Sequence, residues 1–480
     1  MADRYWVGGT GTWDNASTAN WSATSGGASG ASAPTSADNV FFNANSGTAA
    51  VVTIAATAAC SACTVDKSDI NLSLSGSPTF AGAFTLTAGT ITFNSFTLSV
   101  TTFSSSNSNA RTLAFGTGKI VLTGSGTFWN ATIATNLTIT GTPVVDVTYS
   151  GAIACTINYG ATLEAQAISF NITAGTYTLS CNSAYFINLN FTGFSGIFST
   201  GGATSVYGNL TLSSGMTTSG SAALTFAATS GTKTITTNGI LLNFPVTFNG
   251  VGGAWQLQDA LTMSLIRALT LTNGTFNANN FNVTIGSFAL GAGTKTLTLG
   301  SGTWTVLNSP WDANTNVTGL TVVPSTGIIS MTRAGGKTFA GGAQTWPTLN
   351  QGGAGALTVQ QSNTFANITN TVQPATIRFT AGTTQTVSAF GVSGTSGNLI
   401  TLDTTVAGSR ATLSDASGTV NVSFVSIKDI AATGGATWNS LLTNGNVDAG
   451  NNTGWNFTPV VTSGIIYSPA LRSFTERKQF

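Results

Sequence analysis

Two stretches of this sequence, residues 86–103 and 271–288, match position for position without a gap, and this internal repeat limits the folds open to the chain. In both stretches apolar residues alternate with polar ones. Alternation with a period of two, in segments rich in Thr, Val and Ile, predicts short strands with one buried face. The turn residues of the two stretches also coincide: Gly89 with Gly274, and Asn94 with Asn279.

A second repeated element is Gly-Thr-Lys-Thr followed by an apolar residue. It occurs at 231–235 and at 293–297, and a looser copy stands at 336–339. The copies are irregularly spaced, so the repeat is degenerate and carries insertions. No segment has the 3.6-residue apolar period of a long helix. The sequence therefore predicts an all-β protein made of many short strands and turns.

Stacked coils explain this pattern better than separate sandwich domains, which linkers would divide. No linker is evident before residue 458. We therefore expect one long parallel β-solenoid, or β-helix, with aromatic-capped ends and roughly 20–25 residues per coil. About 20 coils would give a rod of about 100 Å. Side chains at the same position of successive coils lie about 4.8 Å apart, where Thr, Ser and Asn form hydrogen bonds and like charges repel.

Charge is scarce, as that stacking requires. Charged residues make up 6% of the chain, with 15 Lys and Arg, 14 Asp and Glu, and no His, against roughly 25% charged residues in typical soluble proteins. A nearly neutral chain offers no electrostatic surface for nucleic acid. The absence of His excludes Ser-His-Asp and Cys-His enzymes and His-ligated metal sites. Polar residues interrupt every apolar run, so we expect no membrane insertion, and no secretory signal is visible.

The two ends differ from the middle and divide the chain into three parts. Residues 1–45 carry three tryptophans and are expected to form an N-terminal cap or attachment region. Residues 46–457 form the solenoid body. Residues 458–480 contain two prolines and a cluster of charges, and we expect a C-terminal attachment tail there.

We assign no catalytic residue, no cofactor and no metal ligand. Glycoside hydrolysis needs two carboxylates about 5–9.5 Å apart, and acids one coil apart in sequence are the candidates: Asp403 with Asp429, and Asp146 with Glu164. The closest pair along the sequence, Asp66 and Asp69, is interpreted as part of a solvated turn. A lyase would need basic residues beside clustered acids that bind calcium, and no such cluster is present.

Tryptophans and cysteines are the other candidates for chemistry. Five dispersed tryptophans are candidate carbohydrate platforms, although packing in the core is the favoured interpretation: Trp129, Trp255, Trp304, Trp311 and Trp346. Cys60 and Cys63 have a metal-like spacing, but a second such pair and His are absent. We interpret these two, with Cys155 and Cys181, as buried small residues or an incidental disulfide.

Three blocks resemble known proteins: 6–13 (WVGGTGTW) with Asn20-Trp21, 243–250 (NFPVTFNG) and 450–457 (GNNTGWNF). They are similar to repeat-rich proteins of tailed bacteriophages, especially aquatic ones. The first block also resembles autotransporter-type repeats of bacterial adhesins. The phage resemblance implies a β-helical protein on the outside of a virion, commonly a homotrimer that serves as a tail fibre, a tailspike or a capsid-attached fibre. No catalytic residue is carried over, because no catalytic motif matches.

The sequence thus predicts a non-enzymatic structural protein on the virion surface, assembled in the host cytoplasm. Its expected partners are other virion proteins and a host surface glycan or receptor, bound through many weak contacts. Three alternatives stay open: a capsid-decorating fibre without a receptor role, a tailspike polysaccharide depolymerase, and a bacterial surface adhesin.

Overall fold

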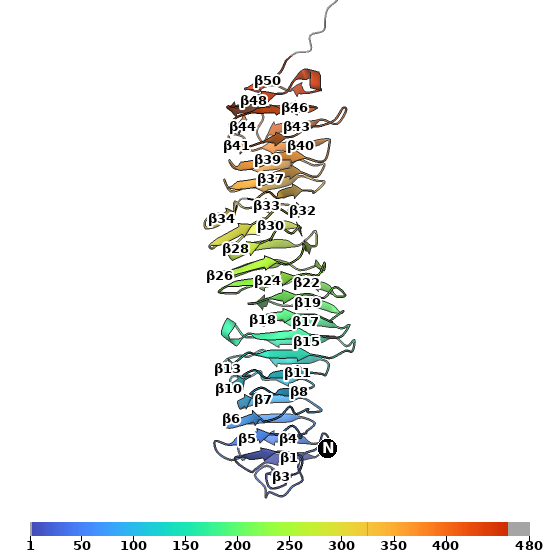
Figure 1. Ribbon diagram of the computed structural model, residues 1–480, viewed down its shortest axis with the longest axis vertical. Coiled ribbons are helices and arrows are strands. Elements are labelled where there is room, and N and C mark those ends of the chain that lie inside the picture. Colours follow the sequence, from blue (N-terminus) through green and yellow to red (C-terminus); the bar gives the residue numbers. More distant parts are fainter. Residues whose placement is uncertain (1, 324, 459–480) are drawn as a thin grey trace, which may run out of the picture.

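Short strands and tight turns wind around one axis in the computed structural model, which describes residues 2–323 and 325–458. Strands account for 49% of the chain and helix for 1%, and the coils stack into a parallel β-solenoid of about 19 turns. The first strands lie at one end of the rod and β50 at the other (Figure 1). The predicted fold class is confirmed. Within the described ranges, no helix is long and apolar enough to span a membrane.

The strands of the described residues form four sheets. The first contains β1 (Asp3–Trp6), β2 (Gly11–Trp13), β3 (Trp21–Ser22), β4 (Asn39–Phe42), β5 (Val51–Ile54), β6 (Cys63–Leu74), β7 (Phe84–Thr92), β9 (Phe103–Ser104), β10 (Arg111–Ala114), β12 (Thr127–Ala131), β13 (Leu137–Thr140), β15 (Cys155–Tyr159), β17 (Thr178–Asn182), β19 (Ile197–Thr200) and β22 (Thr217–Gly220). The second contains β8 (Thr97–Val100), β11 (Lys119–Leu122), β14 (Val144–Val147), β16 (Ile168–Ile172), β18 (Ala184–Asn190), β20 (Thr204–Val206), β21 (Leu210–Thr211), β23 (Leu224–Phe226), β24 (Thr232–Thr236), β26 (Val246–Leu257), β28 (Ala268–Asn277), β30 (Ser287–Leu290), β31 (Lys295–Thr298), β33 (Trp311–Asp312), β34 (Leu320–Val323), β36 (Lys337–Ala340), β38 (Leu357–Gln360), β40 (Ala375–Phe379), β43 (Ile400–Thr404), β46 (Val425–Ile427) and β49 (Val447–Asp448).

The third sheet begins further along the rod and contains β25 (Leu241–Leu242), β27 (Leu261–Met263), β29 (Val283–Ile285), β32 (Thr303–Val306), β35 (Ile328–Met331), β37 (Thr345–Gln351), β39 (Thr364–Asn370), β41 (Thr384–Val387), β42 (Phe390–Gly391), β44 (Ala411–Asp415) and β47 (Ile430–Gly434). The fourth is short: β45 (Thr419–Asn421), β48 (Thr437–Asn439) and β50 (Trp455–Asn456). Two short 3-10 helices, η1 (Glu164–Gln166) and η2 (Leu442–Asn444), interrupt the turns.

Neighbouring strands in the described part of the chain run parallel, except that β3 pairs antiparallel with β1. From β4 onward, register partners on successive turns are separated by as few as 17 residues (Trp438 with Trp455) and as many as 29 (Thr127 with Thr156). This range is wider than the expected 20–25 residues because some turns carry extra loop residues and others have shorter loops. Insertions are accommodated at the corners, and the strands stay in register.

The interior is a column of apolar side chains that alternate along each strand with half-buried polar ones. Phe226 and Phe248 are register partners, and their rings stack with centroids 5.0 Å apart. Phe288 and Trp311 stack at 4.3 Å in the same way. Alternate residues of each strand therefore point into the column and meet an apolar residue of the next turn, which accounts for the two-residue period of the sequence.

Aromatic residues close both ends of the column. Trp6, Trp13 and Trp21 are fully buried at the first turn, and β3 folds back across β1 there. At the far end Trp438 packs against Trp455, with ring centroids 5.1 Å apart. In the segment 1–45, β4 already pairs in parallel with β1 and β6. In the segment 458–480, residues 459–480 lie outside the described part.

The two copies of the long repeat adopt the same backbone. Gly89 and Gly274 both have positive φ, at 98° and 81°. A Cβ atom at Gly89 would lie 2.5 Å from the carbonyl oxygen of Lys67, so that corner admits only glycine. Asn94 and Asn279 also have positive φ, and each donates its side-chain amide to a carbonyl oxygen of the preceding turn, Leu74 (2.7 Å) and Leu257 (3.0 Å).

Candidate functional site

Asp403 and Asp429, the first acidic pair expected from the sequence, are each held by other residues. The Asp403 carboxylate accepts the Nε and Nη2 groups of Arg378, at 2.9 and 2.7 Å. Asp429 accepts the side-chain amide of Asn451 and the backbone N–H of Gly408. These two bonds lower the pKa of Asp429, whereas a general acid needs a raised pKa. The two carboxylates serve as structural links between turns.

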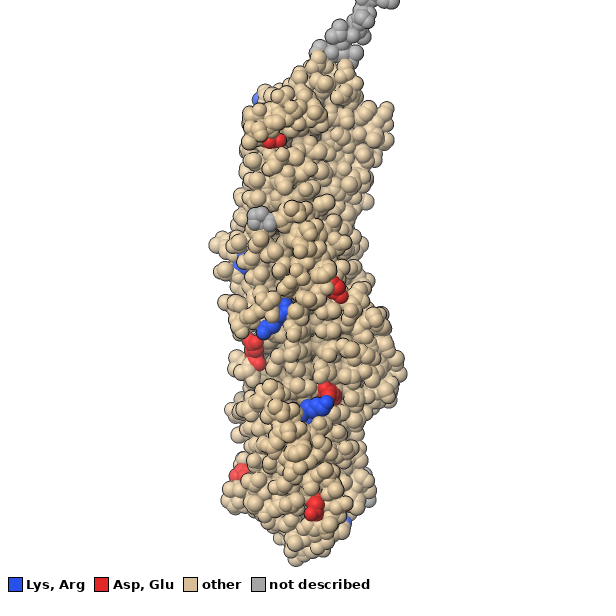
Figure 2. Space-filling view, viewed as in Figure 1, with Lys and Arg blue, Asp and Glu red and all other residues tan. Residues whose placement is uncertain are grey.

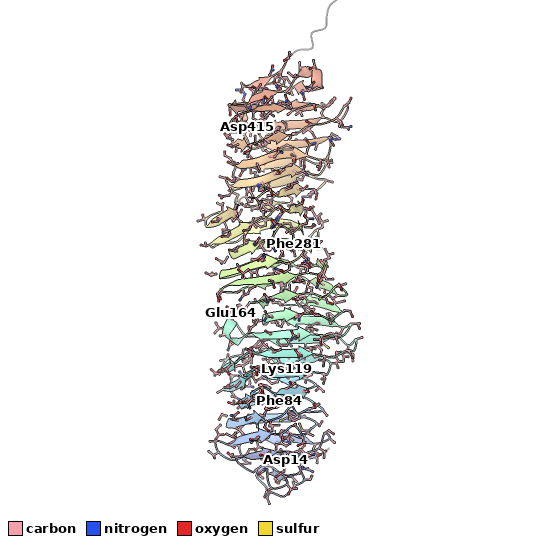
Figure 3. The ribbon with its side chains drawn as sticks, viewed as in Figure 1. Asp14, Phe84, Lys119, Glu164, Phe281 and Asp415 are labelled. Carbon is pink, nitrogen blue, oxygen red and sulfur yellow. The ribbon has the colours of Figure 1, made fainter. Side chains whose placement is uncertain are left out.

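Asp146 and Glu164, the second candidate pair, also have separate partners. Asp146 lies on β14 and accepts hydrogen bonds from Lys119 Nζ (2.6 Å) and Asn171 Nδ2 (2.8 Å), on the turns before and after it. Glu164 lies in η1, on a loop outside the strand ladder (Figure 3), and accepts the Thr229 hydroxyl at 2.5 Å. The position of Glu164 on a corner loop removes it from the row that contains Asp146.

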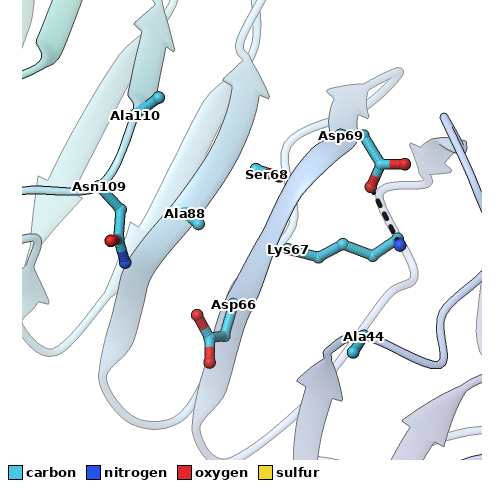
Figure 4. Close-up of a pocket in the computed structure, with 8 residues that line it drawn as sticks. All are labelled: Ala44, Asp66, Lys67, Ser68, Asp69, Ala88, Asn109 and Ala110. Atoms are coloured by element: carbon cyan, nitrogen blue, oxygen red, sulfur yellow. Dashed lines mark ion pairs between the residues drawn. The ribbon is translucent and has the colours of Figure 1, made fainter.

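Asp66 and Asp69 line a surface depression of about 630 Å³, where an extra segment of β6 bulges from the ladder. Lys67 pairs with Asp69 at 3.0 Å, while Asp66 points away from that pair toward the side where Asn109 lies (Figure 4). The Asp69 side chain is 39% exposed. The backbone N–H of Ala49 lowers its pKa, with a smaller contribution from Lys67. The two acids thus lie in a solvated bulge within the strand β6, whereas the sequence predicted a solvated turn.

The tryptophans pack inside the column. Trp129, Trp255, Trp304 and Trp311 are fully buried, and Trp346 is 2% exposed. None of the five presents a ring face to solvent on which a sugar could stack. Core packing, the interpretation favoured by the sequence, is confirmed, and the alternative of carbohydrate platforms is wrong for these residues.

All four cysteines are buried and unbridged. Burial raises the pKa of Cys63, and a hydrogen bond with Cys60 contributes further. The raised pKa keeps the Cys63 thiol protonated, and that state favours neither a thiolate nucleophile nor a metal ligand. Within the described residues, no three Cys, Asp or Glu side chains gather in a way that suits a metal ion.

Buried cations are the structural residues that the sequence did not reveal. Arg111 is 1% exposed and belongs to none of the ion pairs of the described chain. Its guanidinium donates to the carbonyl oxygens of Asn109 (2.9 Å) and Thr135 (2.6 Å). Thr135 lies on the next turn, two residues before Leu137, the register partner of Arg111. The cation therefore links two corner loops through backbone oxygens that have no partner in the strand ladder.

Lys295 occupies the equivalent place on the turn that follows the second copy of the repeat, because it is the register partner of Gly274 as Arg111 is of Gly89. It is 1% exposed, and its Nζ donates to the carbonyl oxygens of Gly293 (2.8 Å) and Thr318 (3.2 Å). Thr318 again lies two residues before the register partner, which is Leu320. Burial lowers the pKa of Lys295.

Lys337, in the looser copy of the same motif, makes a third site of this kind. Its Nζ donates to the carbonyl oxygens of Arg333 (3.0 Å), Gly353 (3.2 Å) and Gly355 (2.8 Å). Burial, and to a smaller extent the charge of Arg333, lowers the pKa of Lys337 to about 8. The Gly-Thr-Lys-Thr signal was visible in the sequence, but its role depends on carbonyl groups contributed by the next turn.

The outer surface carries rows of uncharged polar side chains. Charged residues are few and scattered over the face in Figure 2. Ser205, Thr225, Thr247 and Thr270 are successive register partners and form a row of hydroxyl groups along the second sheet. At the far end, amide groups join Asn456 to Asn439 (3.1 Å) and Asn439 to Asn421 (2.9 Å). The rod thus presents many similar hydrogen-bonding groups along its length.

Comparison with known proteins finds no match for this sequence among protein-family models, curated proteins or solved structures.

Proposed function

We propose that this chain is a structural fibre or spike protein of a bacteriophage virion, and that the sides of its rod contact the host cell surface. The observation that carries the proposal is a single β-solenoid of about 19 turns whose outward rows are uncharged and polar. Every turn is hydrogen-bonded to its neighbours, as a stiff extended spacer requires. The resemblance of the blocks at 6–13, 243–250 and 450–457 to phage proteins supports the virion location.

The polar surface supports attachment through many weak contacts. Hydroxyl and amide groups both donate and accept hydrogen bonds, so they match the hydroxyl groups of cell-surface glycans. Repetition of such groups along the rod multiplies their effect, because each contact after the first is made at high effective concentration. A charge-poor rod also avoids repulsion by the anionic polymers common on bacterial surfaces.

Other virion proteins and two further copies of the chain are the partners that the proposal includes. The homotrimer rests on the resemblance alone. Assembly would take place in the host cytoplasm, before the particle is released. Attachment through residues 458–480 is part of the same proposal.

Immunogold labelling of virions with an antibody against the chain tests the proposal. We expect label on tail fibres or spikes and inhibition of adsorption by the purified protein. Label on the head alone would favour a capsid-decorating fibre, and absence from the particle together with display on a bacterial surface would favour an adhesin.

A separate assay tests whether the chain is a polysaccharide depolymerase. The chain is incubated with host capsule or lipopolysaccharide, and new reducing ends are measured. We expect none. Release of reducing ends that Asp403→Asn or Asp429→Asn abolishes would overturn the structural assignment in favour of a tailspike enzyme.

A further inference from the structure

Near the far end of the rod, the third sheet carries a side branch, β42, that has no strand partner on the following turn among the described residues. β42 pairs with β39 on the preceding turn, and β45 pairs with β48 on the following turn, but within the described residues no register joins β42 to β45. A groove of about 480 Å³ lies here and is lined by residues of both strands. Its volume is within the range of about 300–1,000 Å³ typical of small-molecule sites.

Two amide groups in the groove have a fixed orientation. Asn367 Oδ1 accepts the backbone N–H of Gly391 at 3.2 Å, and Asn421 Oδ1 accepts the side-chain amide of Asn439 at 2.9 Å. Because each oxygen is engaged inside the protein, each Nδ2 is left as a donor. Neither Nδ2 has a hydrogen-bond partner in the described part of the chain.

Acceptors lie beside these donors. Asp415 (Figure 3) is only 7% exposed. Its Oδ1 accepts the backbone N–H of Ser417 at 3.3 Å, and its Oδ2 accepts no hydrogen bond from the described residues. Ser388, Ser417 and Thr419, which carry hydroxyl groups, also line the groove. Phe390, 5% exposed, adds a small apolar contact.

From this arrangement we infer that the groove between β42 and β45 binds a short segment of neutral, hydroxyl-rich glycan. Sugar hydroxyls donate and accept at once, so they pair with both the oriented amide donors and the carboxylate acceptor. The single charge in the lining is the carboxylate of Asp415, which disfavours anionic ligands. The inference deepens the proposed function and rests on it, since it locates part of the receptor contact.

The depression around Asp66 suits a sugar less well, although it is larger. Lys67 and Asp69 already form an ion pair there, and Asn109 donates its amide to the carbonyl oxygen of Thr87. Fewer of its polar groups are therefore free to bind a ligand. The groove at β42 combines partly buried polar groups with unused donors and acceptors.

Gly391 allows the groove to be filled without disturbing the backbone. Its φ is not positive, and a Cβ there would meet Thr369 Cγ2 at 3.4 Å and Asn367 Nδ2 at 3.7 Å, which are ordinary contacts. Gly391→Val should therefore fold and obstruct the groove. Gly336→Val is the matched control, because a Cβ at Gly336 meets nothing within 4 Å.

The test measures binding of the full chain to neutral hexose and N-acetylhexosamine oligosaccharides on an array, followed by titration calorimetry. An array of sulfated and uronic-acid oligosaccharides serves as the anionic arm. We expect a neutral oligosaccharide to bind. Gly391→Val and Asp415→Asn should weaken it at least tenfold, Gly336→Val should leave it unchanged, and thermal unfolding should report that all variants are folded.

Unchanged binding in both groove variants, preference for anionic sugars, or no binding by the unaltered chain would overturn the inference. The proposed function fails on a different result, the absence of the chain from tail fibres and spikes in the labelling experiment. If the antibody labels the fibres but glycan binds elsewhere on the rod, the proposed function stands and the inference about the groove fails.

Discussion

The two copies of the long repeat, around β7–β13 and around β28–β34, agree in some positions and differ in others. Both place a left-handed glycine and a left-handed asparagine at the same corners. Both stack an aromatic pair with centroids 4.3 Å apart, Phe103 on Trp129 and Phe288 on Trp311. The buried cation, however, is Arg111 in one copy and Lys295 in the other.

This difference separates what the fold requires from what it tolerates. The corner requires a long side chain that donates several hydrogen bonds to backbone carbonyl groups of two successive turns. It does not require the planar guanidinium group, because the ammonium group of lysine reaches the equivalent oxygens. The predictions below test whether the two copies respond alike.

Substitution of the corner glycines, Gly89 and Gly274, should cause the largest loss of stability. Gly89→Ala and Gly274→Ala each force a side chain into positive φ and within 2.5 Å or less of a backbone oxygen. We expect each to lower the free energy of unfolding by at least about 2 kcal/mol, measured by chemical denaturation. Gly336→Ala, in open space, should change it by less than about 0.5 kcal/mol. A large loss in only one copy would contradict their equivalence.

Removing the charged groups of Arg111 and Lys295 should cause the second-largest loss of stability. Arg111→Met and Lys295→Met keep much of the volume but leave carbonyl groups unpaired, so each should cost about 1–3 kcal/mol of stability. Lys233→Met is the control, because Lys233 lies in the same Gly-Thr-Lys-Thr motif as Lys295 but is half-buried. Its side chain donates no hydrogen bond within the described chain. Equal losses in all three variants would mean that the carbonyl contacts do not matter. The exchanges Arg111→Lys and Lys295→Arg should cost less than the methionine variants.

The buried Lys337 should make the stability of the protein depend on pH. Its pKa is about 8 in the folded protein, against 10.5 ordinarily. Between these values the unfolded chain binds more protons than the folded chain, so stability rises with pH across that window. We expect the free energy of unfolding to rise by about 1.5 kcal/mol between about pH 8 and pH 9.5. Denaturant titration at each pH measures this rise. Lys337→Met should lack this rise, and persistence of the slope in that variant would assign it to another group.

The asparagine corners should show the smallest effect. Asn94→Ala and Asn279→Ala lose one hydrogen bond to the preceding turn and place alanine at positive φ, for a cost of about 1 kcal/mol. Asn94→Gly and Asn279→Gly lose the bond but relieve the backbone, and we expect about half that cost. Thermal unfolding of the four variants measures the difference. Glycine variants less stable than their alanine counterparts would contradict this account of the corners.

The sequence predicted the architecture because local patterns determine it. Alternation along segments such as 96–100 and the coincident turn residues at Gly89 and Gly274 specify strands and corners without information from elsewhere in the chain. Stacking of the turns then follows, since the side chains of each turn match those at the same positions of the next turn. Burial of Trp129 and the other tryptophans was favoured for the same reason.

The candidate sites were harder to predict because they depend on which turns become neighbours. Asp403 lies on β43 and Asp429 just after β46, its partner strand on the next turn, as their spacing suggested, but the sequence did not show that register also places Asp403 beside Arg378. The carbonyl groups that surround Lys295 belong partly to the next turn, so the motif alone did not indicate burial. The groove beside Gly391 arises where β42 and β45 fail to pair, and no residue type marks a missing ladder.

Electron microscopy of the purified chain tests the central claim most directly, namely that the repeats form one continuous stack. About 19 turns at about 4.8 Å per turn give an unbranched rod about 90 Å long. We expect particles of that length, or uniform bundles of such rods. Strings of separate globules, or compact particles of much smaller length, would contradict a single solenoid and the functional proposals that depend on it.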